Sequence, residues 1–176
     1  DNNNGVPHLL PPGTLSGKYS AASWIGVYPQ TFTIAPQAKQ ELSYYAQIPS
    51  DARPGGHYAA VIYTPVQSAT EKASGASVNA QTGTLFYITV NGPVTESALV
   101  TKFTTNKLWE FGPVEIKSQI RNDGDIHEKP VGAIVLYDIF GRRSQVSPLS
   151  ESNIFPGGVA RDYVNKVGGK IMIGPY

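Results

Sequence analysis

Short apolar runs separated by proline and glycine recur along the chain. Residues 42–48 and 114–121 alternate between apolar and polar, which predicts strands with one buried and one wet face. Residues 58–66 and 131–140 are apolar at nearly every position, which predicts central strands covered on both faces. Because no window has a 3.6-residue apolar period of helix length, the pattern predicts an all-β protein.

Other strands are expected where shorter runs have the same character. Leu99, Thr101 and Phe103 are expected to share one face of such a strand. The remaining strand-like segments are 24–29, 31–34, 84–90, 159–167 and 171–173.

Two corners punctuate these runs. Pro54-Gly55-Gly56 predicts a hairpin-like corner, since proline presets one turn dihedral and glycine supplies the positive one. Residues 122–125, Asn-Asp-Gly-Asp, predict a second turn, because Asn and Asp tolerate left-handed backbone and Gly favours it.

The positions of proline and glycine between the apolar runs also predict how the chain divides into domains. Residues 1–22 have the composition of a loop or tail, 23–92 form a first module and 96–176 a second, with the boundary between Asn91 and Glu96. The expected fold is two immunoglobulin-like β-sandwich modules in tandem, with terminal strands missing from the pattern.

The composition of the chain excludes several classes of partner and of chemistry. A net charge of +1 gives no electrostatic reason to expect nucleic acid as a partner. No apolar run approaches the roughly 20 residues of a spanning helix, so no membrane span is expected. No signal peptide is recognised at the start of the sequence. The absence of cysteine excludes disulfides, thiolate catalysis and cysteine-ligated zinc.

An acidic cluster is the candidate metal site. Asp123, Asp125, His127 and Glu128 could converge on a cation, but a calcium loop needs more oxygen ligands than this spacing supplies. A plain hairpin turn is therefore the preferred interpretation, and no metal or cofactor is predicted.

The histidines provide no catalytic site. His8, His57 and His127 are scattered over tail, turn and loop, and no nucleophile-elbow motif marks a triad. Solvated or locally hydrogen-bonded histidines are expected instead, and the protein is not expected to be an enzyme.

Aromatic residues leave a second function open. Tyr44, Tyr58 and Tyr137 share faces with aliphatic residues, so core packing is expected for them. Tyr63 and Trp109 are the candidate binding residues, because exposed rings stack on sugars. The alternative function is therefore a carbohydrate- or cell-wall-binding module.

The corners and cores of both modules carry a family likeness. Its residues are Trp24-Ile25, Pro29, Phe32, Ile48-Pro49, Asp51-Ala52, Pro54-Gly55, Tyr58-Ala59, Gly83-Thr84-Leu85, Ile88-Thr89-Val90, Asn122-Asp123-Gly124, Pro130-Val131-Gly132, Phe140-Gly141 and Phe155-Pro156-Gly157-Gly158. In these the chain resembles bacterial cell-envelope proteins with tandem immunoglobulin-like domains, above all the WxL-interacting surface proteins and more faintly the pilus chaperones. The resemblance implies a non-enzymatic scaffold, extracellular or in the cell envelope, that holds other surface proteins or cell-wall polymer. No binding residue can be transferred from that family.

The sequence departs from that family at both ends. Such proteins have strands before the position of Trp24 and after Tyr176. A sandwich lacking a strand exposes unpaired backbone groups beside an open core. We therefore expect that the chain is a fragment, or that another chain or its own Asn/Pro-rich tail donates a strand.

Overall fold

The computed structural model describes residues 17–66, 81–105, 113–138 and 140–168. These residues contain nine strands and no helix, and the strands pair into small antiparallel sheets. The all-β prediction is therefore confirmed. The part of the chain described here contains no helix with the length and apolar character needed to cross a membrane.

The chain divides into two compact units between Gly92 and Pro93. Leu9–Gly92 form the first unit, and Pro93–Tyr176 are grouped with Asp1–His8 in the second. Gly92 has a positive φ of 149°, and a Cβ there would collide with the ring of Pro54. Glycine therefore fits the point at which the chain leaves the first unit.

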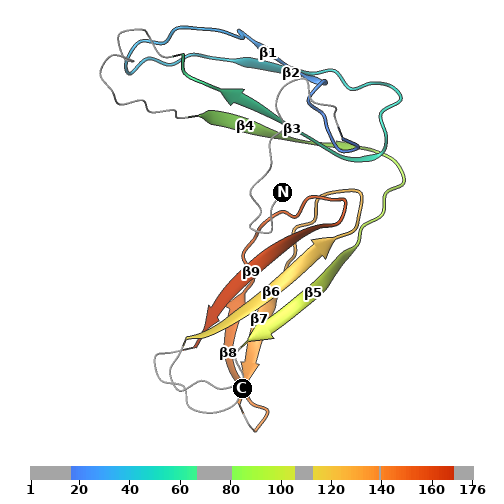
Figure 1. The fold of residues 1–176 in the computed structure, drawn as a ribbon, viewed down its shortest axis with the longest axis vertical. Helices are drawn as coiled ribbons and strands as arrows, with labels where there is room; N and C mark the ends of the chain where they lie inside the picture. Colours follow the sequence, from blue (N-terminus) through green and yellow to red (C-terminus); the bar gives the residue numbers. More distant parts are fainter. Residues whose placement is uncertain (1–16, 67–80, 106–112, 139, 169–176) are drawn as a thin grey trace. The chain divides into compact units, whose positions relative to one another are not determined.

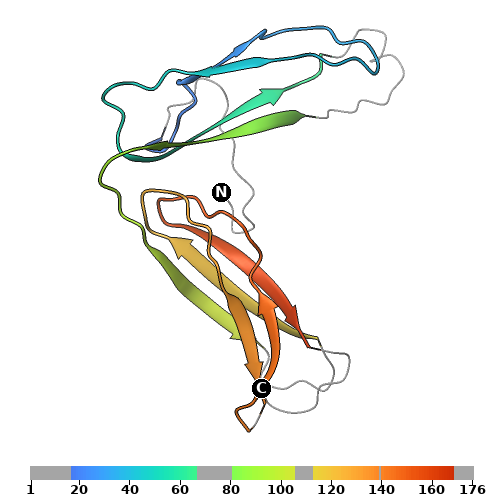
Figure 2. The ribbon, with the colours of Figure 1, turned by 180° about the vertical axis from the view of Figure 1, so that it is seen from behind.

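The first unit contains two strand pairs. β1 (Ile25–Tyr28) pairs with β2 (Ser43–Ala46), and β3 (Gly55–Tyr63) pairs with β4 (Thr82–Val90) (Figure 1). Figure 2 shows the same pairs from behind. The segment before β1 adds one short parallel bridge, from Ser20 to Tyr58.

Aromatic rings connect these two pairs. The ring of Tyr44 on β2 lies 5.2 Å from that of Phe86 on β4, and Trp24 lies 4.4 Å from His57. Phe32 reaches Tyr63 with ring centroids 6.1 Å apart. Rings therefore connect the two strand pairs of the first unit, and Ala21 is the one buried apolar side chain in its described part.

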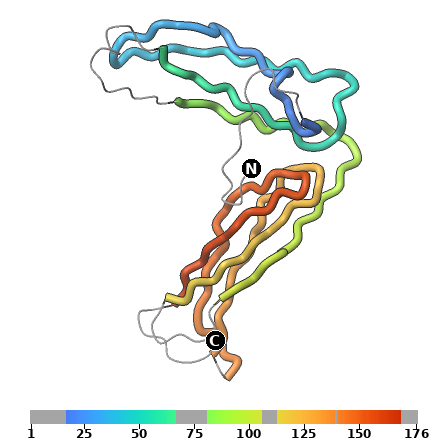
Figure 3. The backbone as a smooth tube through the Cα atoms, viewed as in Figure 1, coloured from blue at the N-terminus to red at the C-terminus, as the bar shows by residue number. Residues whose placement is uncertain are grey.

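The corner at Pro54-Gly55-Gly56 is not a hairpin. β2 and β3 belong to different sheets, so the chain crosses from one sheet to the other here (Figure 3). Gly55, with a φ of 115°, already belongs to β3 and pairs with Val90. The prediction of a glycine-dependent turn located the corner correctly, but the hairpin-like pairing was wrong.

The second unit has a three-stranded sheet and a two-stranded sheet. β5 (Ala98–Thr105), β6 (Val114–Asn122) and β9 (Val159–Val167) are ordered β5-β6-β9. β7 (Ala133–Tyr137) pairs with β8 (Arg143–Pro148), and this hairpin lies across one face of the larger sheet (Figure 2).

The core of the second unit lies between these sheets. Alternate residues of β6 are buried from Val114 to Asn122, which confirms the predicted alternation. One cluster joins β6 and β9 to Ile134 and Leu136 of β7, and another packs Ile120 against Ile154 and Tyr163. The second unit thus has the two-layer aliphatic core expected of a sandwich.

Asn122 closes the corner after β6. Its buried side-chain amide donates to the carbonyls of Ile126 (2.7 Å) and Ile154 (2.9 Å), and its Oδ1 accepts from the backbone N–H of Gly124 (2.8 Å). A Cβ on Gly124 would meet the carbonyl oxygen of Thr95. This corner also crosses between sheets, since β6 pairs with β5 and β9 while β7 pairs with β8. The predicted hairpin was therefore wrong here as well.

Several predicted strands differ in extent. Residues 31–34 are not a strand. Among the described residues of the run 131–140, the strand comprises only the five residues of β7, and Val131 and Phe140 are exposed. β3 is not covered on both faces, because Ile62 is 40% exposed. β8 was not predicted at all. The segment 171–173 lies outside the described residues.

Candidate functional site: the open edge of β7

The position of β7 follows from that of β8. β8 lies opposite β9, where the side-chain amide of Asn165 donates to Ser147 Oγ (3.0 Å) and to the carbonyl of Pro148 (2.9 Å). β7 lies on the other side of β8, and its Ile134 and Leu136 pack against Val114 and Ile116 of β6. The second edge of β7 therefore points toward the side of the unit that carries β5. Within the described residues, β7 pairs with β8 alone.

β5 carries apolar side chains on the face that looks toward the β7–β8 hairpin. Val100 pairs with buried Ile120 and Phe103 pairs with buried Ser118, so all four side chains share the inner face. Yet Val100 is 64% exposed and Phe103 is 60% exposed. The two-stranded sheet is too narrow to cover them.

A buried polar atom lies beside this uncovered region. Ser118 is 5% exposed, and its Oγ has no hydrogen-bond partner in the described structure. Buried polar atoms ordinarily have a hydrogen-bond partner in the protein or in ordered water. We call the free edge of β7 together with Val100 and Phe103 the β7 edge site.

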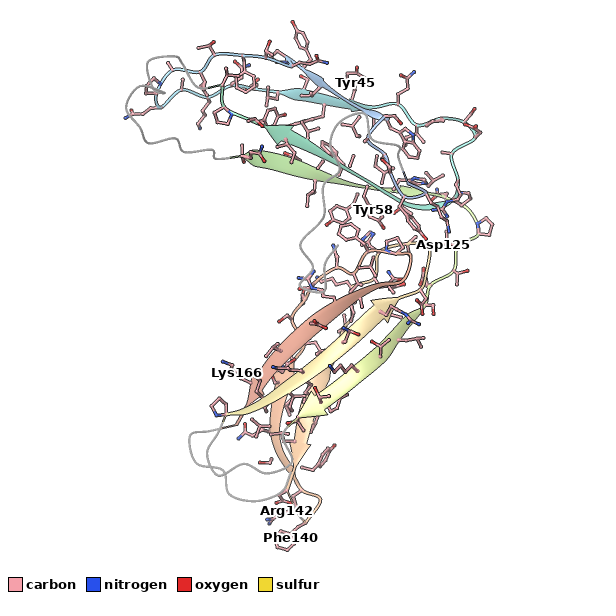
Figure 4. All side chains as sticks on the ribbon, in the orientation of Figure 1. Tyr45, Tyr58, Asp125, Phe140, Arg142 and Lys166 are labelled. Atoms are coloured by element: carbon pink, nitrogen blue, oxygen red, sulfur yellow. The ribbon has the colours of Figure 1, made fainter. Side chains whose placement is uncertain are left out.

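The far end of β7 is held in a tight turn. Asp138 Oδ1 accepts from the backbone N–H groups of Phe140 and Arg142 (2.9 Å each), and Oδ2 accepts from Arg142 Nε (2.9 Å). The hydrogen bond from the Arg142 backbone, together with the nearby guanidinium, lowers the pKa of Asp138. Phe140 and Arg142 lie at the tip of the hairpin, with the guanidinium 5.2 Å from the ring (Figure 4). This turn fixes the end of β7, whose second edge has no partner among the described residues.

The β7 edge site is apolar. β7 reads Ala-Ile-Val-Leu-Tyr and contains no charged residue. The site can therefore offer backbone hydrogen bonds and apolar contacts, and it has no acid–base pair of its own.

Three residues of the candidate metal cluster make contacts that stabilise the fold. Asp123 forms an ion pair with Arg121 (2.8 Å), which raises the pKa of the arginine, and Asp125 Oδ2 accepts from the backbone N–H of Thr95 (3.3 Å). Glu128 forms a backbone bridge with Ile154. No group of three or more His, Asp or Glu side chains placed to hold a metal is found among the residues that the structure describes.

The structure describes one of the two aromatic candidates, Tyr63. Tyr63 lies at the end of β3, where its hydroxyl is 2.6 Å from that of Tyr44. Burial, followed by this hydrogen bond, raises the pKa of Tyr63 to about 12. Trp109 lies outside the described residues. Carbohydrate binding by Tyr63 and Trp109 stays a prediction.

The three histidines and the three tyrosines expected in the core have varied environments. His57 is buried, and its Nε2 lies 2.8 Å from the carbonyl of Arg53, so it is locally bonded as predicted. His8 is outside the described residues. Tyr58 packs edge-on against Tyr87, and Tyr44 packs on Phe86, whereas Tyr137 is 53% exposed. Core packing was therefore wrong for Tyr137, and Tyr44 is 37% exposed although it packs on Phe86.

Val100 and Phe103 were missed because of a β-bulge. The register between β5 and β6 shifts between Val100 and Lys102, so Leu99 pairs with Arg121 on the outer face while Phe103 pairs with Ser118 on the inner face. Leu99 and Phe103 therefore do not share a face as predicted. The sequence of β5 gives no sign of the bulge, because the strand contains neither glycine nor proline.

Comparison with protein-family models, with curated protein sequences and with solved structures gave no match.

Proposed function

We propose that this chain is a non-enzymatic interaction module of the bacterial cell envelope that binds another surface protein by β-strand addition. The added strand runs along β7 and covers the inner face of β5. The observation that carries this proposal is the exposure of Val100 and Phe103 beside an edge that has no partner among the described residues.

The free energy of such binding has two sources. An unpaired strand edge presents backbone N–H and C=O groups that a new strand can satisfy. Complete burial of a valine or phenylalanine side chain contributes about 1.5–3 kcal/mol. Val100 and Phe103 are more than half exposed, so most of this contribution is still to be gained.

The apolar character of the site also indicates what kind of segment it would bind. Because β7 is uncharged, we expect an extended segment with apolar residues at alternate positions and no charge on the face that points inward. Both units are interpreted as immunoglobulin-like sandwiches with incomplete sheets. The envelope location rests on the resemblance of the corner and core residues to envelope proteins.

The test places a photo-crosslinker at the site. p-Benzoylphenylalanine replaces Phe103 in one variant and Lys102 in a matched control, because Lys102 pairs with Gln119 on the outer face of the same strand. Each variant is irradiated with an envelope fraction of the producing organism, and the crosslinked peptides are identified by mass spectrometry.

We expect the probe at position 103 to label one extended segment of another polypeptide with alternating apolar residues, and the probe at position 102 to leave that segment unlabelled. Labelling confined to this chain's own residues would contradict binding in trans. Equal labelling from both positions would contradict a site on the inner face.

A further inference from the structure

β4 has an unusual free edge for a soluble domain. It runs over nine residues, Thr82–Val90, and contains no charged residue and no proline. Its pairing with β3 is continuous from Tyr63↔Thr82 to Gly55↔Val90, without a bulge. Within the described chain it pairs with β3 alone.

The other long or exposed edges carry the features that prevent strands from pairing with foreign chains. Charged residues, prolines, bulges and short length all serve that purpose. β5 has a bulge and Lys102, β8 has Arg143 and Pro148, and β9 has Arg161, Asp162 and Lys166. β1 and β2 have only four residues each, and β7, with five, is the edge already proposed to take a strand from a partner. β3 is equally long and has no Asp, Glu, Lys, Arg or proline, but the segment before β1 bridges to it at Tyr58. Among the described strands, β4 is the long edge strand that lacks all of these features and has no second neighbour.

The sequence of β4 is also self-complementary. Two antiparallel copies centred on Phe86 place Leu85 of one copy directly opposite Tyr87 of the other. Leu85 is 46% exposed and Tyr87 is 41% exposed, so this pairing buries apolar surface on the outer face. No like charges meet, because the strand has none.

The inner face supports the same register. Phe86 already packs on Tyr44 of the opposite sheet, and the two-fold axis brings the two Phe86 rings together. Nine residues at about 3.4 Å each give a seam of roughly 30 Å. A two-fold pairing of identical edges also closes on itself, so it ends at a dimer.

We propose that the first unit self-associates: β4 of one copy pairs antiparallel with β4 of a second copy, centred on Phe86, to form a sheet ordered β3-β4-β4-β3. This interface uses a different unit and a different edge from the strand addition at β7. Either of the two can therefore fail without the other.

Disulfide trapping tests the register, because the chain has no cysteine of its own. Leu85→Cys and Tyr87→Cys are made as single variants, one carrying a mass tag, and oxidised separately and as a mixture. Directly opposed residues have Cβ atoms about 4.5–5.5 Å apart, so a shift of about 1 Å brings them to the distance of about 3.5–4.5 Å that a disulfide requires. We expect the mixed disulfide between positions 85 and 87 to form at least about tenfold faster than either homodisulfide, since identical positions face each other only diagonally.

Sedimentation velocity tests the association itself. We expect the unmodified chain to dimerise and Leu85→Lys to raise the dissociation constant at least about tenfold, since each dimer then loses two apolar Leu85–Tyr87 contacts and carries a lysine on each side of its seam. Ile62→Lys is the control, because it places the same charge on the same face of β3, away from the seam. A chain that stays monomeric at all concentrations, or equal rates for the three disulfides, would overturn the proposal.

Discussion

The two units share antiparallel strand pairs and corners that cross between sheets, but they differ in what fills the space between their sheets. In the second unit, eight apolar side chains are buried, among them Val114, Ile134 and Ile154. In the described part of the first unit, the buried side chains are Ala21 and His57, and the sheets meet through half-exposed rings. Two units with similar strands and corners can therefore have different cores. We expect the second unit to be the more stable of the two.

The largest difference in stability should appear when an isoleucine is truncated to alanine in each unit. Ile154→Ala empties a site that is 1% exposed and should destabilise the second unit by about 3 kcal/mol. Ile62→Ala, at a site 40% exposed, should cost the first unit less than about 1 kcal/mol. Urea unfolding followed by the amide NMR signals of each unit measures both values. Equal losses would contradict the difference between the cores.

The next largest loss of stability should come from the polar corner of the second unit, which is tested apart from its apolar core. Asn122→Ala leaves two carbonyls and one N–H without their side-chain partner, in a site with 0% exposure. We expect a loss of about 2 kcal/mol. Thr104→Ala, on the exposed outer face of β5, is the control and should change stability by less than about 0.5 kcal/mol. Similar values for the two variants would show that the Asn122 hydrogen bonds are not required.

A smaller effect should distinguish the first unit by its alkaline sensitivity. The pKa of Tyr63 is raised from 10.0 to about 12, so at pH 10 and above the unfolded chain releases this proton before the folded chain does. The stabilising contribution is thus complete below pH 10 and is lost as the pH rises through about 12. Unfolding of the first unit should show this loss in the wild-type protein but not in Tyr63→Phe. An unchanged pH profile in the variant would argue against the Tyr44–Tyr63 contact.

The smallest effect concerns the turn at the end of β7. The pKa of Asp138 is lowered by its hydrogen bonds to the Arg142 and Phe140 backbones and by the Arg142 guanidinium. This contribution is present above the ordinary carboxyl pKa and is lost as the pH falls through the lowered value. Asp138→Asn should remove that acid sensitivity from the second unit while leaving the first unit unchanged. Urea unfolding at neutral and acidic pH measures it.

Local patterns predicted where strands occur better than which strands pair. Alternation located β6, and Asn122 and Gly55 located corners, because these signals lie within a few residues. Both corners looked like hairpins, since a turn signal does not say whether the next strand returns beside the last one or crosses to another sheet. β8 was missed because Arg143–Pro148 contains one aliphatic residue, Val146, apart from its proline.

The sequence led us to expect either a fragment or a sandwich that takes a strand from another chain or from its own Asn/Pro-rich tail, and these alternatives stay predictions. The sequence did not place the candidate site. Its location depends on which face Phe103 occupies, and the bulge between Val100 and Lys102 decides that. A bulge in a run without glycine or proline leaves no local signal, so only the pairing of β5 with β6 reveals it.

The central claim is that β7 has an open edge, and amide hydrogen exchange of the isolated chain tests it most directly. β6 is paired on both sides, with β5 and β9, whereas β7 is paired with β8 alone in the described structure. We predict slow exchange for the amides along β6 and an alternation of slow and fast exchange along Ala133–Tyr137, because every second amide of an edge strand faces solvent. Uniformly slow exchange along β7 would mean that this edge is already covered, and it would contradict the account.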